Sequence, residues 1–176
     1  MYDEMQERVE GFASLILRRY FCESDVEFLI STFDDDIVWL GAGPQQRAEG
    51  KEAVAACFLE GREDLARCHM YGERYVTRAL SGDCFLCEGD SWIQPGEDTG
   101  LYFKTHQRIT FIFRLVGDEL KTVHIHNSVD FSDIQEGELF PVQAGRDAYR
   151  KLEEKLADKD RQIELMLSQL PGGMMI

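Results

Sequence analysis

The residues best suited to chemistry lie in the stretch 104–131, where residue types alternate as they do in strands. His124 and His126 stand two positions apart, and alternate side chains of a strand point to the same face. His106 and Asp130 would share that face. Imidazole and carboxylate groups are ligands of zinc and iron, so these residues form a candidate metal site.

Acid–base catalysis requires a histidine or a carboxylate inside a pocket, where its surroundings shift its pKa. On the apolar face of the two strands the polar side chains are Gln107 and Asn127, and an amide does not transfer a proton at neutral pH. If the polar face lined the pocket instead, His124 or His126 beside Asp130 could act as a base. This alternative stays open. We prefer the arrangement in which the apolar face lines the pocket, and for it we expect no catalytic residue.

Cysteine and aromatic residues give two further candidates. Cys84 and Cys87 have redox or zinc spacing, but three positions along a strand their thiols point to opposite faces, which favours a structural role. Aromatic side chains in strands could wall a pocket for a planar or apolar ligand, although such residues more often belong to the core. The candidate ligand-binding residues are Trp39, Tyr71, Trp92, Gln107, Arg108, His124, His126 and Asn127.

The loop between the two long strands decides which residues share a face. A two-residue turn at 117–118 would place Phe111 opposite His124 and mix apolar with polar side chains, because a shift of one residue reverses every side chain. A three-residue loop at 117–119 keeps the two kinds apart, so we predict this register. Its pairs are Phe113 with Val123, Phe111 with Ile125, and Thr110 with His126. The polar face then holds His106, Arg108, Thr122, His124 and His126, and the buried face Ile109, Phe111, Phe113, Val123 and Ile125.

Length, composition and charge limit the kinds of protein this chain can be. With 176 residues and 44% apolar content it can bury one good core, so we expect one domain with an appendage. Nucleic-acid phosphates and anionic membranes would repel a net charge of -14, so neither is an expected partner. No apolar run is long enough to span a bilayer. Five scattered cysteines fit a reducing cytoplasm, where we expect the protein to be.

The period of the apolar residues predicts helices before the strands. Ser24, with Glu27 three residues on, is expected to cap the second helix. The expected helices are Asp3–Tyr20, one that begins at Ser24, and Gly50–Leu65, and the strands before the long pair are 37–40, 68–80 and 84–93. This order predicts an α+β fold with helices on one face of a curved antiparallel sheet.

The last helix has a different pattern. From Tyr149, apolar residues recur in steps of three and four over three heptads, as in a coiled coil, and Lys159 interrupts this seam. A second copy of the chain would bury the seam, which predicts a homodimer. An amphipathic helix packed back on the sheet is the alternative. The expected dimer interface comprises Leu152, Lys155, Leu156, Asp160, Ile163 and Met166.

Several of these features occur together in one group of proteins. They are the helical start, the strand Ile37-Val38-Trp39-Leu40 followed by Gly41, the sequence Arg108-Ile109-Thr110, and the sequence Val123-His124-Ile125-His126-Asn127-Ser128. Together they resemble the nuclear transport factor 2-like superfamily, in its SnoaL-like and kinase-association-domain branch, over about residues 8–132. The resemblance implies a cone-shaped α+β barrel with a pocket between sheet and helices, commonly dimeric. His-x-His-x-Ser recurs there as a structural feature, so we expect no metal and no cofactor.

The end of the chain carries a second, shorter resemblance. Residues 170–176, in which Pro-Gly-Gly is followed by apolar residues, resemble the segment that leads into a PAS domain in bacterial signalling proteins such as diguanylate cyclases and histidine kinases. The resemblance implies that a PAS domain follows. We therefore expect a domain over 1–140, a signalling helix over 141–170, and the start of a truncated following domain over 171–176.

Two classes of function remain. In the first, the chain is a non-catalytic sensory or dimerising input domain that binds a small ligand and signals through its coiled coil to a PAS or other output domain. In the second, it is a SnoaL-like isomerase, cyclase or hydrolase that acts on a small substrate in the same pocket. The helix favours the first class, because a free-standing enzyme has no need of a bare apolar seam.

Overall fold

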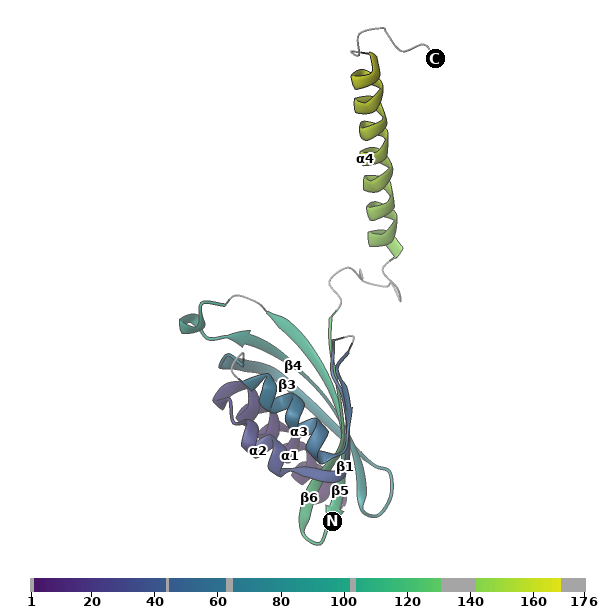
Figure 1. Cartoon of the computed structure of the whole chain (residues 1–176). Helices are drawn as coiled ribbons and strands as arrows, with labels where there is room; N and C mark the ends of the chain where they lie inside the picture. The colour runs from purple at the N-terminus through teal and green to yellow at the C-terminus, as the bar shows by residue number, and fades with distance from the viewer. Residues whose placement is uncertain (1, 44, 63–64, 102–103, 131–141, 169–176) are drawn as a thin grey trace. The chain divides into compact units, whose positions relative to one another are not determined.

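The computed structural model describes residues 2–43, 45–62, 65–101, 104–130 and 142–168. The chain divides into two units, residues 1–130 and residues 131–176. The first unit holds helices and a sheet, and the second holds the long helix α4 (Figure 1).

Helices α1, α2 and α3 of the first unit pack on one face of a curved sheet (Figure 1). Within the described residues six strands form this sheet, in the order β2-β1-β6-β5-β4-β3. The predicted α+β fold is therefore confirmed. The elements are α1 Tyr2–Glu23, α2 Val26–Ser31, β1 Phe33–Leu40, β2 Arg47–Glu49, α3 Lys51–Glu60, β3 Cys68–Ala79, β4 Cys84–Pro95, the 3-10 turn η2 Glu97–Thr99, β5 Thr105–Val116 and β6 Glu119–Val129.

One strand pair departs from the predicted antiparallel sheet. The first strand, β1, runs parallel to the last, β6, with Trp39 opposite Ile125. Parallel strands need a long connection between them, and here it contains the other strands of the sheet. The short strand β2 extends the sheet beyond β1 in antiparallel fashion.

The cap of the second helix lies one residue later than predicted. Asp25 rather than Ser24 is the N-cap, and its side chain accepts a hydrogen bond of 2.9 Å from the backbone N–H of Phe28. Ser24 instead has a φ of 56°, in the left-handed region, and its hydroxyl donates to the carbonyl of Leu65. Because the Ser24 hydroxyl in the turn between α1 and α2 is bound to Leu65, the side chain of Asp25 caps the second helix.

Polar contacts between side chains of α1 and strand β3 hold the helix on the sheet. Glu73 of β3 accepts hydrogen bonds from Ser14 and Arg18 of α1 and from the hydroxyl of Tyr75. One turn nearer the start of α1, Glu10 accepts the backbone N–H of Thr77 at 3.0 Å. These contacts position the later half of α1, which faces the inside of the sheet.

The β5–β6 hairpin combines the two registers that the sequence allows. Its turn has two residues, with Val116 opposite Glu119, and Gly117 takes a φ of 61° that favours glycine. A bulge at Val123 then shifts the register by one residue. Beyond the bulge the predicted pairs of Phe111 with Ile125 and Thr110 with His126 are confirmed.

The predicted pair of Phe113 with Val123 is wrong, because Phe113 lies opposite Thr122. Thr122 therefore belongs to the inner face, where it is fully buried, and not to the polar outer face. Its hydroxyl lies 2.9 Å from that of Thr32, so each polar group has a partner inside the core. Val123 sits at the bulge and is half-buried.

The core lies between the helices and the inner face of the sheet. Phe111 and Phe113 of β5 stack with their ring centroids 5.1 Å apart, and Phe12 of α1 contacts Phe113. Buried side chains of α1 complete this layer, as the helical period predicts. The core residues include Val9, Ala13, Ile16, Leu17, Leu29, Phe33, Ile37, Val54, Ile109 and Ile125.

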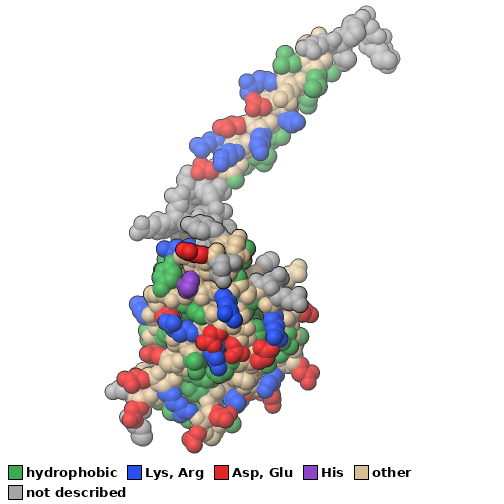
Figure 2. Space-filling model, turned by 90° about the vertical axis from the view of Figure 1, so that its left-hand side faces the viewer, with side chains coloured by type: hydrophobic (Ala, Val, Ile, Leu, Met, Phe, Trp, Pro, Cys, Tyr) green, Lys and Arg blue, Asp and Glu red, His purple; other side chains and the backbone are tan. Residues whose placement is uncertain are grey.

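The second unit contains helix α4, Val142–Ser168. Apolar side chains lie along one side of this helix and charged ones along the other (Figure 2). The apolar residues Tyr149, Leu152, Leu156, Ile163, Met166 and Leu167 are all exposed. No described helix is long and apolar enough to cross a membrane. The predicted boundaries at 140 and 170, and segment 171–176, fall outside the described residues.

Candidate ligand-binding site

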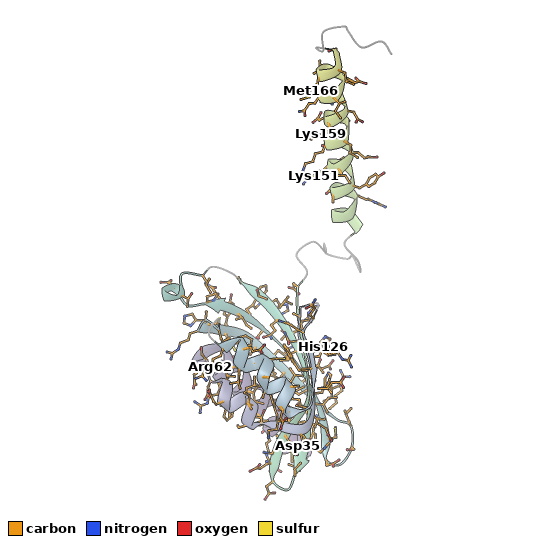
Figure 3. The ribbon with its side chains drawn as sticks, viewed as in Figure 1. Asp35, Arg62, His126, Lys151, Lys159 and Met166 are labelled. Atoms are coloured by element: carbon orange, nitrogen blue, oxygen red, sulfur yellow. The ribbon has the colours of Figure 1, made fainter. Side chains whose placement is uncertain are left out.

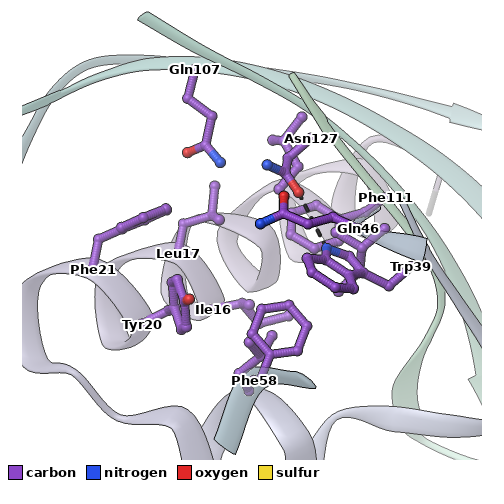
Figure 4. Close-up of a pocket in the computed structure, with 13 residues that line it drawn as sticks. Ile16, Leu17, Tyr20, Phe21, Trp39, Gln46, Phe58, Gln107, Phe111 and Asn127 are labelled. Carbon is purple, nitrogen blue, oxygen red and sulfur yellow. Dashed lines mark hydrogen bonds between the residues drawn. The ribbon is translucent and has the colours of Figure 1, made fainter. Parts of the chain in front are cut away.

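A cavity of about 200 Å³ lies between the helices and the inner face of the sheet (Figure 4). Helix α1 lines one side of it at positions 16, 17, 20 and 21, which share one face of a helix. Strands β5 and β6 line the other side with alternate residues. The lining residues are Ile16, Leu17, Tyr20, Phe21, Leu29, Trp39, Gln46, Phe58, Gln107, Ile109, Phe111, Ile125 and Asn127.

The cavity lining is uncharged and mostly apolar. None of the described side chains that line it is an acid, a base or a histidine, and burial raises the pKa of the Tyr20 hydroxyl, which stays protonated. A charged ligand group would lose its hydration here without gaining a charged partner. The cavity therefore suits an uncharged ligand.

The side chains of Trp39 and Asn127 form one polar contact of the cavity. Trp39 Nε1 donates a hydrogen bond of 3.2 Å to Asn127 Oδ1, drawn as the dashed line in Figure 4. Phe58 of α3 packs on the Trp39 ring at 4.9 Å between centroids. Because its oxygen is bound to Trp39, Asn127 is held in one orientation, and its amide nitrogen is left to donate.

Gln107 is the second polar residue of the sheet in this cavity. Its side chain is buried, with 5% of its surface exposed, and within the described part of the chain its Oε1 atom has no hydrogen-bond partner. Figure 4 shows this amide reaching from the sheet toward Leu17 and Phe21 of α1. An unpaired buried carbonyl oxygen costs about 1–3 kcal/mol, so it calls for a donor from a ligand or a water molecule.

A second cavity of about 300 Å³ lies next to the first. Phe21, Gln107 and Asn127 line both cavities, so these side chains stand at the junction between them. The second lining is aliphatic apart from Phe21, Cys68, Thr105 and the two amides. Its remaining members are Leu65, Ala66, Cys68, Ile93, Leu101, Thr105 and Val129.

The structure brings together three of the eight candidate ligand-binding residues. Trp39, Gln107 and Asn127 line the first cavity. The other five line neither of these two cavities, because they occupy the outward positions of their strands, and Figure 3 shows His126 on the side of the sheet away from the helices. They are Tyr71, Trp92, Arg108, His124 and His126.

The outer face of the sheet carries its own cluster. Trp92 packs on His106 at 4.9 Å between ring centroids, and the ammonium of Lys104 lies 4.6 Å from the Trp92 ring. The two ring nitrogens of His106 each lie 3.5 Å from a carboxylate oxygen, one of Asp90 and one of Asp130. The residues of this cluster contact one another on the outer face and do not line the cavity.

The two histidines of β6 are neighbours on the outer face. Burial, and after it the nearby His126, lowers the pKa of His124. Among the described residues no three His, Cys, Asp or Glu side chains gather closely enough to hold a metal ion. Cys84 and Cys87 point to opposite faces of β4, as their spacing predicts, and burial raises the pKa of the Cys87 thiol to about 11.

The residues that sequence reasoning missed come from the helices and from a loop. Ile16, Leu17, Tyr20 and Phe21 of α1 line the cavity together with Phe58 of α3. Their helical period identified an inward face, but period alone does not separate a packed side chain from one beside a cavity. Gln46 is exposed, and its Oε1 accepts the backbone N–H of Gly43. Nothing in the sequence marked it.

The comparison with solved structures identifies the fold. Helices on the inner face of a curved sheet, with a cavity between them, are the nuclear transport factor 2-like fold, and two of the solved structures similar to this chain bear that description. No protein-family profile matches the sequence, and no curated protein matches it.

Three solved structures illustrate the likeness. A nuclear transport factor 2-like protein of unknown function from Pseudomonas putida is 21% identical, aligns over 76% of this chain and 95% of its own, and has a TM-score of 0.57. A candidate dehydratase of that family from Streptomyces avermitilis is 18% identical over 75% and 100%, with a TM-score of 0.60. A candidate calcium/calmodulin-dependent protein kinase type II association domain from Thiobacillus denitrificans is 16% identical over 68% and 93%, at 0.56. At these identities the likeness concerns the fold alone.

Proposed function

We propose that the protein is a non-catalytic input domain of a bacterial signalling protein. It binds a small uncharged ligand in the cavity and passes the change through a dimeric coiled coil to an output domain. The observation that carries this proposal is the cavity lining, which is apolar and uncharged apart from amide and hydroxyl groups. Such a lining suits binding, because nothing in it moves a proton at neutral pH.

The second cavity supports a link between ligand and helix. Val129, the last residue of β6, lines that cavity, and the chain continues from β6 to α4. A ligand in the second cavity therefore contacts the end of the strand from which the chain leads to the helix. A ligand transmits a signal only if it binds one conformation of the protein more tightly than another. We propose that the end of β6 is the segment whose conformation the ligand changes.

The exposed face of α4 supports a dimer. Leu156 and Ile163, one heptad apart, are 56% and 53% exposed, and a narrow stripe of this kind is stable when a second copy covers it. In a parallel pair, Lys155 lies beside Asp160 of the partner subunit. The output domain we propose is a PAS domain in the cytoplasm, on the sequence of residues 170–176 and the five free cysteines.

Removal of Trp39 is expected to weaken ligand binding. Trp39→Ala opens the cavity wall and frees Asn127 Oδ1, and Asn127→Leu removes the amide, so each variant should bind a pocket ligand about tenfold more weakly or worse. A thermal-shift screen of uncharged small molecules on the full chain, followed by titration calorimetry of the hits, measures this loss.

Trp92→Ala is the matched control for that screen, since it removes the same side chain from the outer face of the sheet. Its ligand affinities should equal those of the unaltered protein. Hits that bind equally well to all of these variants would place the ligand outside the cavity and contradict the proposal.

A SnoaL-like enzyme acting in the same cavity is the alternative, because one fold neighbour is named as a candidate dehydratase. An enzyme would need a proton-transferring group at the ligand. The candidates His124 and His126 belong to the outer face, and Asp130 lies beside His106 on that face. Turnover of a cavity ligand, lost in Asn127→Leu but kept in His126→Ala, would favour the enzyme.

The pairing of Lys155 with Asp160 predicts the orientation of the coil. A dimer contains this pair twice, at about 0.5 kcal/mol each, so Lys155→Glu should weaken the dimer by about 1 kcal/mol, and adding Asp160→Lys should restore it. Sedimentation equilibrium at low salt measures both dissociation constants. Failure of the second change to restore the dimer would exclude the parallel register.

A further inference from the structure

We propose, on the basis of the ligand-binding function above, that the ligand is an elongated uncharged molecule with a hydroxyl group part-way along its length. One part of the molecule fills the first cavity and another part fills the second. The hydroxyl lies at the junction, where it donates a hydrogen bond to Gln107 and accepts one from Asn127. This assignment names the chemical class of a ligand that the fold alone leaves open.

Gln107 is the reason that the ligand group must donate a hydrogen bond. Its Oε1 atom is an acceptor without a partner in the described chain, and the side chain that carries it is almost fully buried. Strand β5 holds the residue between Ser91 of β4 and Val129 of β6, so the backbone cannot move away to expose the amide. The ligand group at this point must therefore bring a hydrogen to the Oε1 oxygen.

Asn127 is the reason that the same ligand group must also accept a hydrogen bond. Its Oδ1 atom already accepts from Trp39 Nε1, which turns the N–H groups of the amide to other partners. Asn127 pairs with Ile109, so it is the diagonal neighbour of Gln107 on the same face of the hairpin, about 7–8 Å away between backbones. We place one small polar group of the ligand between the amides that these two positions carry. A hydroxyl donates and accepts at a single atom, and so fits both.

The two cavities differ in the groups they suit. Aromatic rings of Trp39, Phe58 and Phe111 line the first, which favours a flat ring. Aliphatic side chains such as Leu65, Ile93 and Leu101 line the second, which favours an alkyl part. The first cavity, at about 200 Å³, is smaller than the roughly 300–1,000 Å³ usual for small-molecule sites, and the second, at about 300 Å³, is at the lower limit of that range. The two together fall well within it.

Three probes of one shape test the hydroxyl. 1-Phenylbutan-1-ol carries a hydroxyl between its ring and its alkyl chain, 1-phenylbutan-1-one carries an acceptor only, and butylbenzene carries neither. Titration of the full chain should give the alcohol about tenfold tighter binding than the ketone, because only the alcohol pairs with Gln107 Oε1. The hydrocarbon should bind no more tightly than the ketone.

Gln107→Leu, with Gln107→Met as the second variant if leucine prevents folding, separates the hydroxyl from the rest of the site. The variant should bind the alcohol and the ketone equally and should bind butylbenzene at least as tightly as the unaltered protein. Its thermal midpoint without ligand should also rise, since an unpaired acceptor has been removed. A side chain with a purely structural role would lower that midpoint.

The outcomes distinguish this proposal from the function on which it rests. If the three probes bind alike and Gln107→Leu changes none of the affinities, the hydroxyl assignment is overturned while ligand binding stands. If no probe binds to the unaltered protein, both the hydroxyl assignment and the ligand-binding function are overturned. If Gln107→Leu still bound the alcohol about tenfold more tightly than the ketone, the hydroxyl would not contact Gln107. This result would also overturn the assignment.

Discussion

Replacing Leu156 and Ile163 of α4 by aspartate is expected to convert the proposed dimer into a monomer. About half of each side chain is exposed in the single chain, so a second copy has that half left to bury. Burial of half a leucine or isoleucine side chain contributes roughly 1 kcal/mol, and a dimer contains four of these side chains. Their loss, about 4 kcal/mol, raises the dissociation constant about a thousandfold. Aspartates that face each other across the seam weaken it further.

The mass of the full chain in solution, by light scattering at several concentrations, measures this change. Ala157→Asp with Ser168→Asp is the matched control, because it adds the same charge to α4 outside the apolar seam. The control should remain a dimer. If the seam variant kept the mass of the unaltered protein, α4 would be packed against its own chain or would have no partner, and the signalling proposal would lose its main support.

The hairpin shows how far alternation in a sequence predicts a sheet. Alternation placed Phe111, Ile125 and the outward histidines on their faces, because the period of two holds on either side of the bulge. It did not reveal the bulge itself, since an extra residue at Val123 leaves both flanking patterns intact. Thr122 was assigned to the outer face because the predicted register carried the alternation unbroken through Val123. Its hydroxyl partner Thr32 is 90 residues away in the sequence. A buried pair of that kind depends on tertiary contacts.

The sequence predicted the polar residues of the cavity but not the residues that the helices contribute to it. Asn127 and Gln107 are polar residues at apolar-face positions, and this mismatch between residue type and face marked them as exceptional. The contributions of Tyr20 and Phe58 follow from the distance between helix and sheet, which no single-sequence pattern contains. The parallel pairing of β1 with β6 was likewise out of reach, because a short apolar strand has the same pattern in either direction.

Replacing Phe113 by alanine is expected to lower the free energy of unfolding by about 3–5 kcal/mol. Its side chain is 0% exposed and lies between the rings of Phe12 and Phe111, at 5.3 and 5.1 Å, where helix and sheet meet. The cavity left by its removal cannot close, because both neighbouring rings are anchored on different elements. Urea unfolding of the full chain, followed by tryptophan fluorescence at one protein concentration, measures the loss.

Ile112→Ala is the control for Phe113→Ala, since Ile112 is the next residue of β5 and points to the outer face, where it is half-buried. It should cost about 1 kcal/mol. Equal losses in the two variants would contradict the assignment of faces on which the cavity depends. Phe113 itself does not line the cavity, so the folded fraction of Phe113→Ala should bind the alcohol probe with unchanged affinity. A parallel fall in stability and affinity would mean that the core and the ligand site are one packing unit.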